Sequence, residues 1–287
     1  MALQVRPLAP AVGAEIVDFD LSKDFGDDDF AQIESVFNER GLLLFRKQHL
    51  SEQRHIEISQ RFGKLQDHVL KPFLIPGYEQ TLRITNLLDD EGEPLGIGDA
   101  GLFWHSDTSY TQNPCRCSLL YSIEVPAREG ERSYGDTLFA SLTAAYEALD
   151  EATKAQIADL CSEHSYGKHY ARMQAAGSKR PDLTEAQKRE VPKVVHPLVR
   201  PHPITREKAL FVNDGYTTHI IGMEERQSDA LLKKLVDQTT RPEFTYRHRW
   251  NEGDLLIWDN SSTQHLAIAD YALPQRRLMH RTTVLAV

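Results

Sequence analysis

The chain has 287 residues, of which 40% are hydrophobic and 26% are charged, so it can bury one substantial core in a single domain spanning residues 1–287. Its formal net charge of -9 argues against nucleic-acid binding, because neutralising phosphates requires a basic surface. No apolar leader is visible at the amino terminus, and no segment has the roughly 18 uninterrupted apolar residues of a spanning helix. We therefore expect a cytoplasmic protein with no membrane partner.

The three cysteines offer no candidate site. Cys115, Cys117 and Cys161 make an odd number, and Cys115 and Cys117 lack the CxxC spacing of a zinc or redox motif. We expect all three to be reduced thiols with a structural role.

The beginning of the chain alternates strand and helix signals. Apolar and polar residues alternate on either side of Gly13, which predicts two short strands. Apolar residues at helical spacing predict a helix over residues 28–40 with Gly41 as its C-terminal cap, and the apolar run 42–45 suits a buried strand. A second helix is expected over residues 51–62, where the first residue is a serine that can act as N-cap.

Three irregular segments have the composition of surface loops. Residues 64–80 contain two prolines, residues 89–101 are rich in glycine and acidic side chains, and much of residues 165–192 is polar. A strand is expected between the first two, over residues 81–88. We interpret the three segments as lids that cover a site.

The rest of the chain is dominated by strand signals. A strand is expected at residues 118–125, followed by a loop over 126–135. Helical patterns cover residues 141–161, with a break near Asp150, and residues 225–238. Further strands are expected at residues 194–199, 209–213, 244–250, 255–258 and 277–285. The pattern predicts a mostly β fold with flanking helices.

One triplet, His105-Ser106-Asp107, is the only HxD sequence in the chain. On a strand the histidine and the aspartate would project to the same side, although an isolated HxD is more often a surface histidine beside a turn aspartate. His265 follows a predicted strand and a polar turn, and it could join them. Two histidines and one carboxylate on one face of a metal leave the opposite positions open, as Fe(II) oxygenases require.

Arginines after His265 decide between this interpretation and the commoner one, since the chain has 12 histidines from which a third ligand might be chosen. A 2-oxo acid that chelates iron leaves a distal carboxylate, which a buried guanidinium can bind with two parallel hydrogen bonds. Arg277 suits that role, and Arg281 lies on the same side of the same predicted strand. A second inward arginine indicates a second anion.

These motifs occur together in one order along nearly the whole chain, and that order resembles the taurine dioxygenase and phenoxyacetate dioxygenase family. The resemblance is carried by Gly13-Ala14-Glu15-Ile16, Phe103-Trp104-His105-Ser106-Asp107, Gly135-Asp136-Thr137, Leu210-Phe211-Val212-Asn213-Asp214-Gly215-Tyr216-Thr217-Thr218, Trp258-Asp259-Asn260, Gln264-His265 and Pro274-Gln275-Arg276-Arg277-Leu278-Met279-His280-Arg281.

The resemblance implies a double-stranded β-helix, also called a jelly roll or cupin-like fold, that binds Fe(II), 2-oxoglutarate and O₂. The positions that match the metal ligands of the family are His105, Asp107 and His265. Thr137 and Arg277 match the positions that bind the cosubstrate carboxylate. The family also suggests a homo-oligomer, either a dimer or a tetramer.

Further positions match the pocket for the prime substrate. Arg281 matches the residue that binds the substrate anion, and His68 matches a histidine that contacts the same anion. Tyr170 and Tyr216 stand where the taurine enzyme has aromatic walls, although a buried tyrosine is more often part of a core.

Two departures from the family pattern argue against taurine itself. Lys71 replaces an expected tyrosine, and Gly101 replaces an expected asparagine. The glycine removes a hydrogen-bonding amide and leaves room, while the lysine adds positive charge near a lid. The chain also has extra residues within 127–134 compared with the taurine enzyme. We expect a bulkier anionic substrate.

The resemblance therefore predicts a dioxygenase that hydroxylates a small anionic substrate, namely a sulfonate, a sulfate ester or an aryloxy or carboxylate compound. The hydroxylated carbon would collapse to an aldehyde or ketone, with succinate and CO₂ as coproducts. Two alternatives remain open. A zinc-type hydrolase can use the same three ligands, and a jelly-roll binding protein could bury the same histidines without catalysis.

Overall fold

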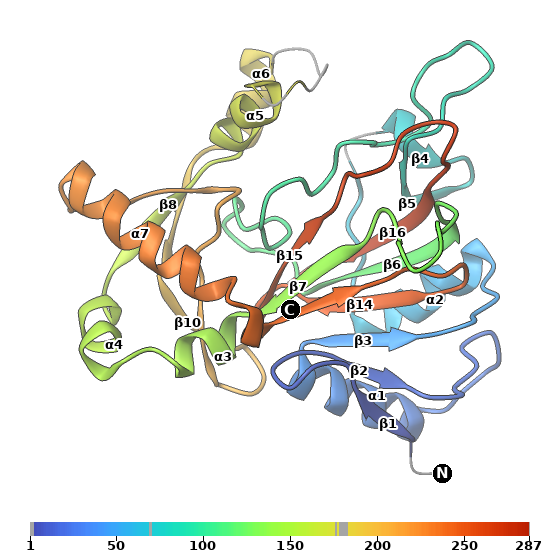
Figure 1. Cartoon of the computed structure of the whole chain (residues 1–287), viewed down its shortest axis with the longest axis horizontal. Helices are drawn as coiled ribbons and strands as arrows, with labels where there is room; N and C mark the ends of the chain where they lie inside the picture. The colour runs from blue at the N-terminus through green and yellow to red at the C-terminus, as the bar shows by residue number, and fades with distance from the viewer. Residues whose placement is uncertain (1–2, 69–70, 176, 178–182, 287) are drawn as a thin grey trace.

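The computed structural model describes residues 3–68, 71–175, 177 and 183–286 (Figure 1). The fold is mostly sheet with helices outside it, as the sequence predicted. One half of the molecule is built on an eight-stranded sheet with β2 and β3 parallel and the other neighbours antiparallel. Its strands, in spatial order, are β1 (Val5–Pro7), β2 (Ala14–Ile16), β3 (Leu42–Phe45), β14 (Leu255–Asp259), β6 (Cys117–Glu124), β16 (Leu278–Val284), β5 (Tyr78–Thr85) and β4 (Leu74–Ile75).

Both faces of this sheet are buried. Along β3, Leu43 and Phe45 pack on one face while Leu42 and Leu44 pack on the other, and all four are fully buried. A strand with apolar residues on both sides needs cover on both sides, since each buried leucine contributes about 1.5–3 kcal/mol. This explains why an uninterrupted apolar run, rather than an alternating one, forms this strand.

Helices α1 (Asp27–Arg40) and α2 (Glu52–Phe62) cover the first face (Figure 1). Gly41 ends α1 in the left-handed region at φ 66, and its amide donates to the carbonyl of Phe37. The side chain of Ser51 accepts a hydrogen bond from the amide of Arg54 and so caps α2. Both caps confirm the sequence prediction.

A smaller sheet covers the second face. It consists of β13 (Thr245–His248), β7 (Thr137–Ser141) and β15 (Thr263–Ala267), all antiparallel. Phe139 of β7 packs against Trp258 of β14, with the rings tilted and their centroids 5.6 Å apart. β7 and β15 were not predicted as strands, and β15 mixes polar and apolar residues without alternation.

The other half of the molecule has its own apolar core (Figure 1). Its helices are α3 (Leu142–Glu147), α4 (Glu151–Ile157), α5 (Tyr166–Ala175), α6 (Glu185–Glu190) and α7 (Glu225–Thr239). Its strands form the sheet β12 (Thr217–Ile220), β8 (Cys161–His164), β9 (Val194–Pro197) and the pair β10 (Val199–Pro201), β11 (Lys208–Leu210). The short 3₁₀ helices η1 (Lys71–Phe73) and η2 (Pro242–Phe244) lie elsewhere in the chain.

Two predictions about this half need correction. The helical region ends before Cys161, which begins strand β8, although the expected break is present and Asp150 caps α4. The segment expected to be an irregular lid begins with helix α5, where His169, Tyr170 and Met173 are buried. Apolar and aromatic residues at helical spacing there were outweighed by the polar residues that follow. Within the described part of the chain, no helix has the length and apolar character needed to cross a bilayer.

Candidate metal centre

Two histidines from distant parts of the chain meet across a short antiparallel bridge. The amide of His105 donates to the carbonyl of His265 at 3.0 Å, and the amide of His265 donates back at 2.8 Å. Their imidazole rings lie 4.2 Å apart between centroids. His265 belongs to β15, so the small sheet fixes one histidine and the bridge aligns the other with it.

The HxD triplet does not lie on a strand, which corrects the sequence interpretation. Only His105 takes part in the bridge, and a turn begins at Asp107. Ser106 donates its hydroxyl to the carbonyl of Thr263 at 2.8 Å, which ties the triplet to the start of β15. Both ligand side chains therefore face the same space through a turn rather than through strand alternation.

His105, Asp107 and His265 form a compact, buried group. Asp107 Oδ1 lies 3.5 Å from His105 Nε2 and 3.9 Å from His265 Nε2, and one ligand atom from each residue lies within 4.8 Å of the others. Ligands about 2.1 Å from a shared ion lie roughly 3 Å apart at right angles. The three atoms are too far apart for good hydrogen bonds and close enough to hold a metal ion between them.

Neighbouring groups fix the orientation of this group. Ser118 donates its hydroxyl to Asp107 Oδ2 at 2.6 Å, which leaves Oδ1 facing the imidazoles. Asn260 accepts the amide of Asp107 through Oδ1 at 3.0 Å. The carbonyl of Phe103 lies 2.8 Å from His105 Nδ1, so that nitrogen carries the proton and Nε2 is free to act as a ligand.

The protonation states also suit a metal. Burial, followed by the charge of His105, lowers the pKa of His265 to about 3. Burial by itself would raise the pKa of Asp107, but Arg281, His265 and His105 hold that pKa well below its usual value. A neutral imidazole beside an ionised carboxylate is the form in which these side chains bind metals.

Arg277 is a second buried feature of the site. Arg277 directly precedes β16. The hydroxyl of Thr85 donates to the backbone carbonyl of Arg277 at 2.6 Å, and the side-chain oxygen of Asn86 accepts the amide of Arg277 at 3.0 Å. Only 4% of the residue is exposed, and burial lowers the pKa of its guanidinium. Among the described residues, Arg277 Nε has no hydrogen-bond partner. A buried guanidinium with a free N–H is suited to bind an anion.

Thr137 and Arg277 approach the same indole. Trp250 donates its Nε1 proton to Thr137 Oγ1 at 3.0 Å, and the guanidinium carbon of Arg277 lies 5.9 Å from the Trp250 ring. Gly135 makes room for the arginine, because a Cβ built there would lie 3.0 Å from Arg277 Cδ. Its φ of +67 also favours glycine. The predicted cosubstrate residues are therefore neighbours.

Arg281 and His68 lie beside the triad. Arg281 Nη1 is 3.5 Å from Asp107 Oδ1. Burial, followed by the charge of Arg281, lowers the pKa of His68 to about 4. Within the described part of the chain, His68 Nε2 and Arg281 Nε are buried without a hydrogen-bond partner. Both are positioned to receive an anion next to the metal ligands.

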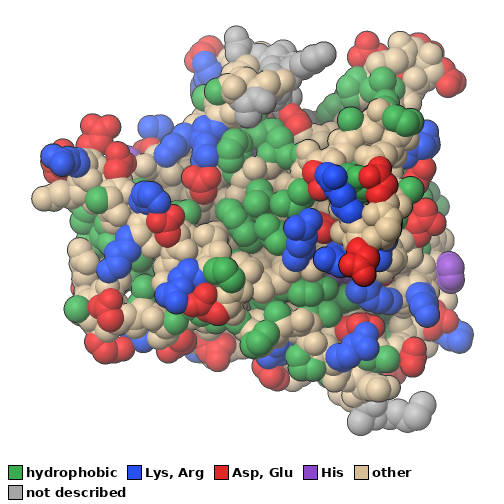
Figure 2. Space-filling model, viewed as in Figure 1, with side chains coloured by type: hydrophobic (Ala, Val, Ile, Leu, Met, Phe, Trp, Pro, Cys, Tyr) green, Lys and Arg blue, Asp and Glu red, His purple; other side chains and the backbone are tan. Residues whose placement is uncertain are grey.

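Aromatic side chains extend from His105 towards helix α5. Tyr216 lies edge-on to His105 at 5.9 Å, and Tyr110 lies 4.8 Å from both Tyr216 and Tyr166 between ring centroids. Tyr170 is buried 6.0 Å from Tyr166. Burial raises the pKa values of Tyr110 and Tyr216, so both phenols stay protonated. In Figure 2, hydrophobic side chains gather at the centre of the face, between the two halves of the molecule.

The two positions that depart from the family pattern differ in location. Gly101 has φ +76 and places no side chain in the site. A Cβ built at this position would lie 3.3 Å from His105 Cε1. A larger residue at 101 would therefore contact a metal-ligand ring directly. Lys71 is exposed at the first residue of η1.

Four supporting residues were not identified from the sequence, namely Ser118, Asn260, Trp250 and Tyr110. Asn260 stood in the recognised Trp258-Asp259-Asn260 motif, and Ser118 was the first residue of a predicted strand. Trp250 was the last residue of another predicted strand, and no local pattern marks Tyr110. Their roles come from contacts with residues far away in the sequence.

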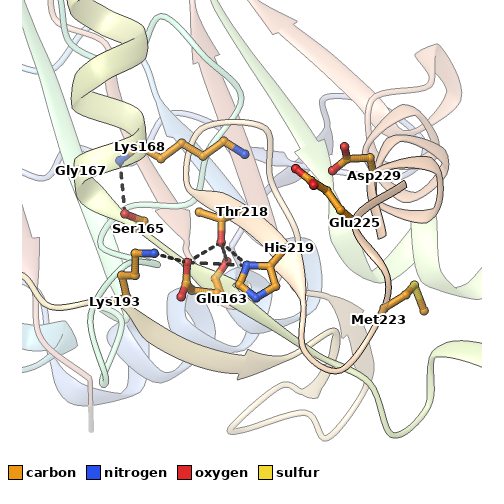
Figure 3. A pocket seen from close by; sticks show the side chains of 10 residues that line it. All are labelled: Glu163, Ser165, Gly167, Lys168, Lys193, Thr218, His219, Met223, Glu225 and Asp229. Carbon is orange, nitrogen blue, oxygen red and sulfur yellow. Dashed lines mark hydrogen bonds and ion pairs between the residues drawn. The ribbon is translucent and has the colours of Figure 1, made fainter. Parts of the chain in front are cut away.

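A hollow of about 690 Å³ is lined by residues of β8, α5, β12 and α7, among others (Figure 3). One ion pair and several hydrogen bonds involve its lining residues. Glu163 Oε1 lies 3.1 Å from Lys193 Nζ and accepts the hydroxyl of Thr218 at 2.8 Å, while Lys168 Nζ donates to the carbonyl of Thr217 at 3.0 Å. The hollow is a polar surface cleft and shares no lining residue with the triad.

Comparison with known proteins agrees with this geometry. The family model described as taurine catabolism dioxygenase TauD, TfdA family matches residues 4–283. The alpha-ketoglutarate-dependent 2,4-dichlorophenoxyacetate dioxygenase of Cupriavidus pinatubonensis is 34% identical, covering 99% of this chain and 98% of that protein. The alpha-ketoglutarate-dependent sulfate ester dioxygenase of Pseudomonas putida is 31% identical, with 99% and 90% covered.

A solved structure is similar over the same extent. The crystal structure of AAD-2 in complex with Mn(II) and N-oxalylglycine has a TM-score of 0.82 and 30% sequence identity, and covers 100% of this chain and 98% of that chain. The protein is therefore an enzyme of the 2-oxoglutarate-dependent dioxygenase class, which uses Fe(II), 2-oxoglutarate and O₂. It belongs to the TauD/TfdA family. The family, the enzyme class and the cofactors predicted from the sequence are confirmed.

Proposed function

We propose that the enzyme hydroxylates a small anionic substrate, namely a sulfonate, a sulfate ester or an aryloxy or carboxylate compound, with succinate and CO₂ as coproducts. The observation that carries this proposal is a buried His-Asp-His group flanked by two arginines whose Nε atoms lack partners among the described residues. A metal and two anions account for all of these groups.

His105, Asp107 and His265 would hold Fe(II) through two neutral imidazoles and one carboxylate oxygen. Bound Fe(II) supplies the redox chemistry that couples O₂ reduction and oxidative decarboxylation of 2-oxoglutarate to C–H hydroxylation. Ser118 keeps Asp107 Oδ2 occupied, so only Oδ1 is available to the metal. The protein therefore contributes placement, and no side chain needs to act as a general acid or base.

Arg277 and Thr137 would bind the distal carboxylate of 2-oxoglutarate. Two parallel hydrogen bonds from a guanidinium match a carboxylate in shape and charge, and burial strengthens them. Trp250 orients Thr137 Oγ1 by donating to it, which leaves the threonine proton free for the ligand. The cosubstrate would thus bridge the metal and the arginine.

Arg281 and His68 would bind the anionic group of the prime substrate, next to the metal ligands. Tyr216 and Tyr170 would form aromatic walls, and Gly101 would leave space beside His105. Lys71 would add positive charge at the entrance. Where the hydroxylated carbon bears oxygen or sulfur as a leaving group, the product would collapse to an aldehyde or ketone. Relatives named for 2,4-dichlorophenoxyacetate and for sulfate esters support these two classes.

The proposal includes an architecture. The eight-stranded sheet and the β13–β7–β15 sheet would be the two halves of a double-stranded β-helix within one catalytic domain over residues 1–287. Segments near 64–80, 89–101 and 165–192 would act as lids, since His68, Gly101 and Tyr170 come from them. We also propose a dimer or tetramer in the cytoplasm.

A turnover screen tests the proposal. Purified enzyme with Fe(II), ascorbate and 2-oxoglutarate is given aryloxyacetates, alkyl sulfates and sulfonates, and succinate is measured. We expect substrate-dependent succinate release that His105→Ala abolishes. A zinc hydrolase would instead release sulfate or alcohol without consuming 2-oxoglutarate, and a binding protein would release nothing. Anaerobic Fe(II) with 2-oxoglutarate should also give a metal-to-ligand absorption band, which neither alternative predicts.

A further inference from the structure

The turn between β14 and β15 is connected to two of the three metal ligands, Asp107 and His265. Its first residue, Asp259, accepts the hydroxyl of Thr263 through its carbonyl at 2.6 Å and the amide of Ser261 through Oδ1 at 2.7 Å. The next residue, Asn260, accepts the amide of Asp107. Thr263 leads into the strand that carries His265. Any shift of this turn would move two of the three ligands.

A histidine from the other half of the molecule holds the carboxylate of Asp259. His202 lies between β10 and β11, and its Nε2 is 2.5 Å from Asp259 Oδ2. Each residue is 2% exposed. Among the described residues, the side chain of His202 forms hydrogen bonds with Asp259, Ile204 and Thr205 and with none of the metal ligands, so the proposed mechanism gives it no role.

Backbone contacts fix which nitrogen of His202 carries the proton. The amides of Ile204 and Thr205 point at Nδ1, at 3.2 Å and 3.0 Å. Nδ1 must therefore accept, and Nε2 must carry the hydrogen that it donates to Asp259. The hairpin between β10 and β11 is thus built to present one N–H to a buried carboxylate.

We propose that His202 and Asp259 are positioning residues for the metal centre. The pair fixes the position of the β14–β15 turn. The turn then positions Asp107 through Asn260 and His265 through β15. The inference rests on the proposed metal-binding role of the triad. It extends the support of the metal to a residue that contacts no ligand, and it connects the second half of the molecule to the site.

The same strand supplies a matched control. At the opposite end of β14, His248 Nε2 lies 3.1 Å from Asp254 Oδ2, and both residues are as deeply buried. Asp254 accepts the guanidinium of Arg46 and the amide of Asn251 rather than any group of the turn. Breaking this second pair removes an equivalent hydrogen bond without touching the turn.

Metal affinity of the metal-free protein tests the proposal, with Co(II) as the probe in anaerobic calorimetry. His202→Asn is too short to reach Asp259 and should weaken Co(II) binding by about 10- to 100-fold, as loss of an outer support does. His202→Gln retains a donor in the Nε2 position and should bind within a few-fold of wild type. His248→Asn should lower the melting temperature but leave Co(II) affinity unchanged. Equal affinity for His202→Asn and wild type would overturn the inference.

A measurement on the wild-type protein covers the case in which His202→Asn does not fold. With ¹⁵N-labelled histidine, the Nε2 proton of His202 should be protected from exchange, and its resonance should move when Zn(II) is added, whereas that of His248 should not. A static His202 resonance would contradict the proposal. Failure of wild type to bind either metal would instead refute the proposed function, so the two outcomes are distinct.

Discussion

The metal-ligand group and the two arginines are built in different ways. In the set His105, Asp107 and His265, one carboxylate faces two imidazole rings. Hydrogen bonds orient His105 and Asp107, and the rings of Phe139 and Trp258 pack against His265. Arg277 and Arg281 are cations whose Nε atoms lack partners among the described residues. The first region is organised before any ligand binds, whereas the second has buried guanidinium N–H groups that an anionic ligand would complete.

An ion pair joins Arg281 to the metal-ligand group, because Arg281 Nη1 lies 3.5 Å from Asp107 Oδ1. Among the described residues, Arg277 forms no ion pair with the triad, and its backbone is held by Thr85 and Asn86 instead. The comparison indicates that metal binding and cosubstrate binding should be separable by mutation, while substrate binding and metal binding should be partly coupled.

The largest expected effect comes from removing the carboxylate. Asp107→Ala should reduce metal affinity and succinate release by more than about 100-fold, because loss of a mere support residue already changes them by about 10- to 100-fold. Co(II) titration and a succinate assay measure this, with circular dichroism as the control for folding. Wild-type affinity in Asp107→Ala would remove the triad from the mechanism.

A smaller effect should distinguish the roles of the two arginines. Arg277→Leu should lower kcat/KM for 2-oxoglutarate by about 100-fold, or about 3 kcal/mol, since two charge-assisted hydrogen bonds are lost, while Co(II) affinity should be unchanged. Arg281→Leu is the matched variant, and it should raise KM for the prime substrate with little change in KM for 2-oxoglutarate. Steady-state kinetics with each substrate varied in turn measure both. If the two variants gave the same profile, the assignment of separate anions would be wrong.

The smallest expected effect is a pH dependence of folding stability that comes from a histidine near the metal ligands. His164 is fully buried, and its Nδ1 lies 3.4 Å from the hydroxyl of Ser109, two residues after Asp107. Burial, followed by the charges of His196 and Arg200, lowers the pKa of His164 from 6.5 to about 3. Between pH 6.5 and pH 3, His164 therefore binds a proton in the unfolded chain but not in the folded chain. The stability that the neutral ring contributes is fully present above pH 6.5 and decreases as the pH falls towards 3.

Urea unfolding of the metal-free protein between pH 7 and pH 4 measures this effect. Between pH 6 and pH 4, wild type should lose about 1 kcal/mol per pH unit more than His164→Gln, because only wild type loses this proton linkage. Parallel curves for the two proteins would mean that His164 is protonated in the folded state. Arg277 and Arg281 should contribute nothing to the difference between wild type and His164→Gln.

The candidate site shows how far local patterns reach. His105, Asp107, His265, Arg277 and Arg281 were selected from spacing and from the family resemblance. The structure brings four of them together, while Arg277 is buried beside Trp250. Helix α1 with Gly41, helix α2 with Ser51 and strand β3 also follow directly from apolar spacing and capping residues. In these cases the deciding interactions lie within a few residues of one another.

Other features depended on distant pairing. Strand β15 has no alternating pattern, yet it forms because β7 and the bridge to His105 satisfy its backbone. The expected strand at the HxD triplet is instead a turn held by Asn260. Tyr110 and Trp250 enter the site through contacts that no local window contains.

By itself the sequence determined which chemical groups the enzyme has and which segments form the helices and the buried strands, because spacing, capping and side-chain polarity act over short range. The tertiary structure decided which groups meet. His105 pairs with a residue 160 positions away, and His202 reaches Asp259 from a different half of the molecule. Sheet register and the packing of two cores set these contacts, and neither is encoded in any single stretch of the chain.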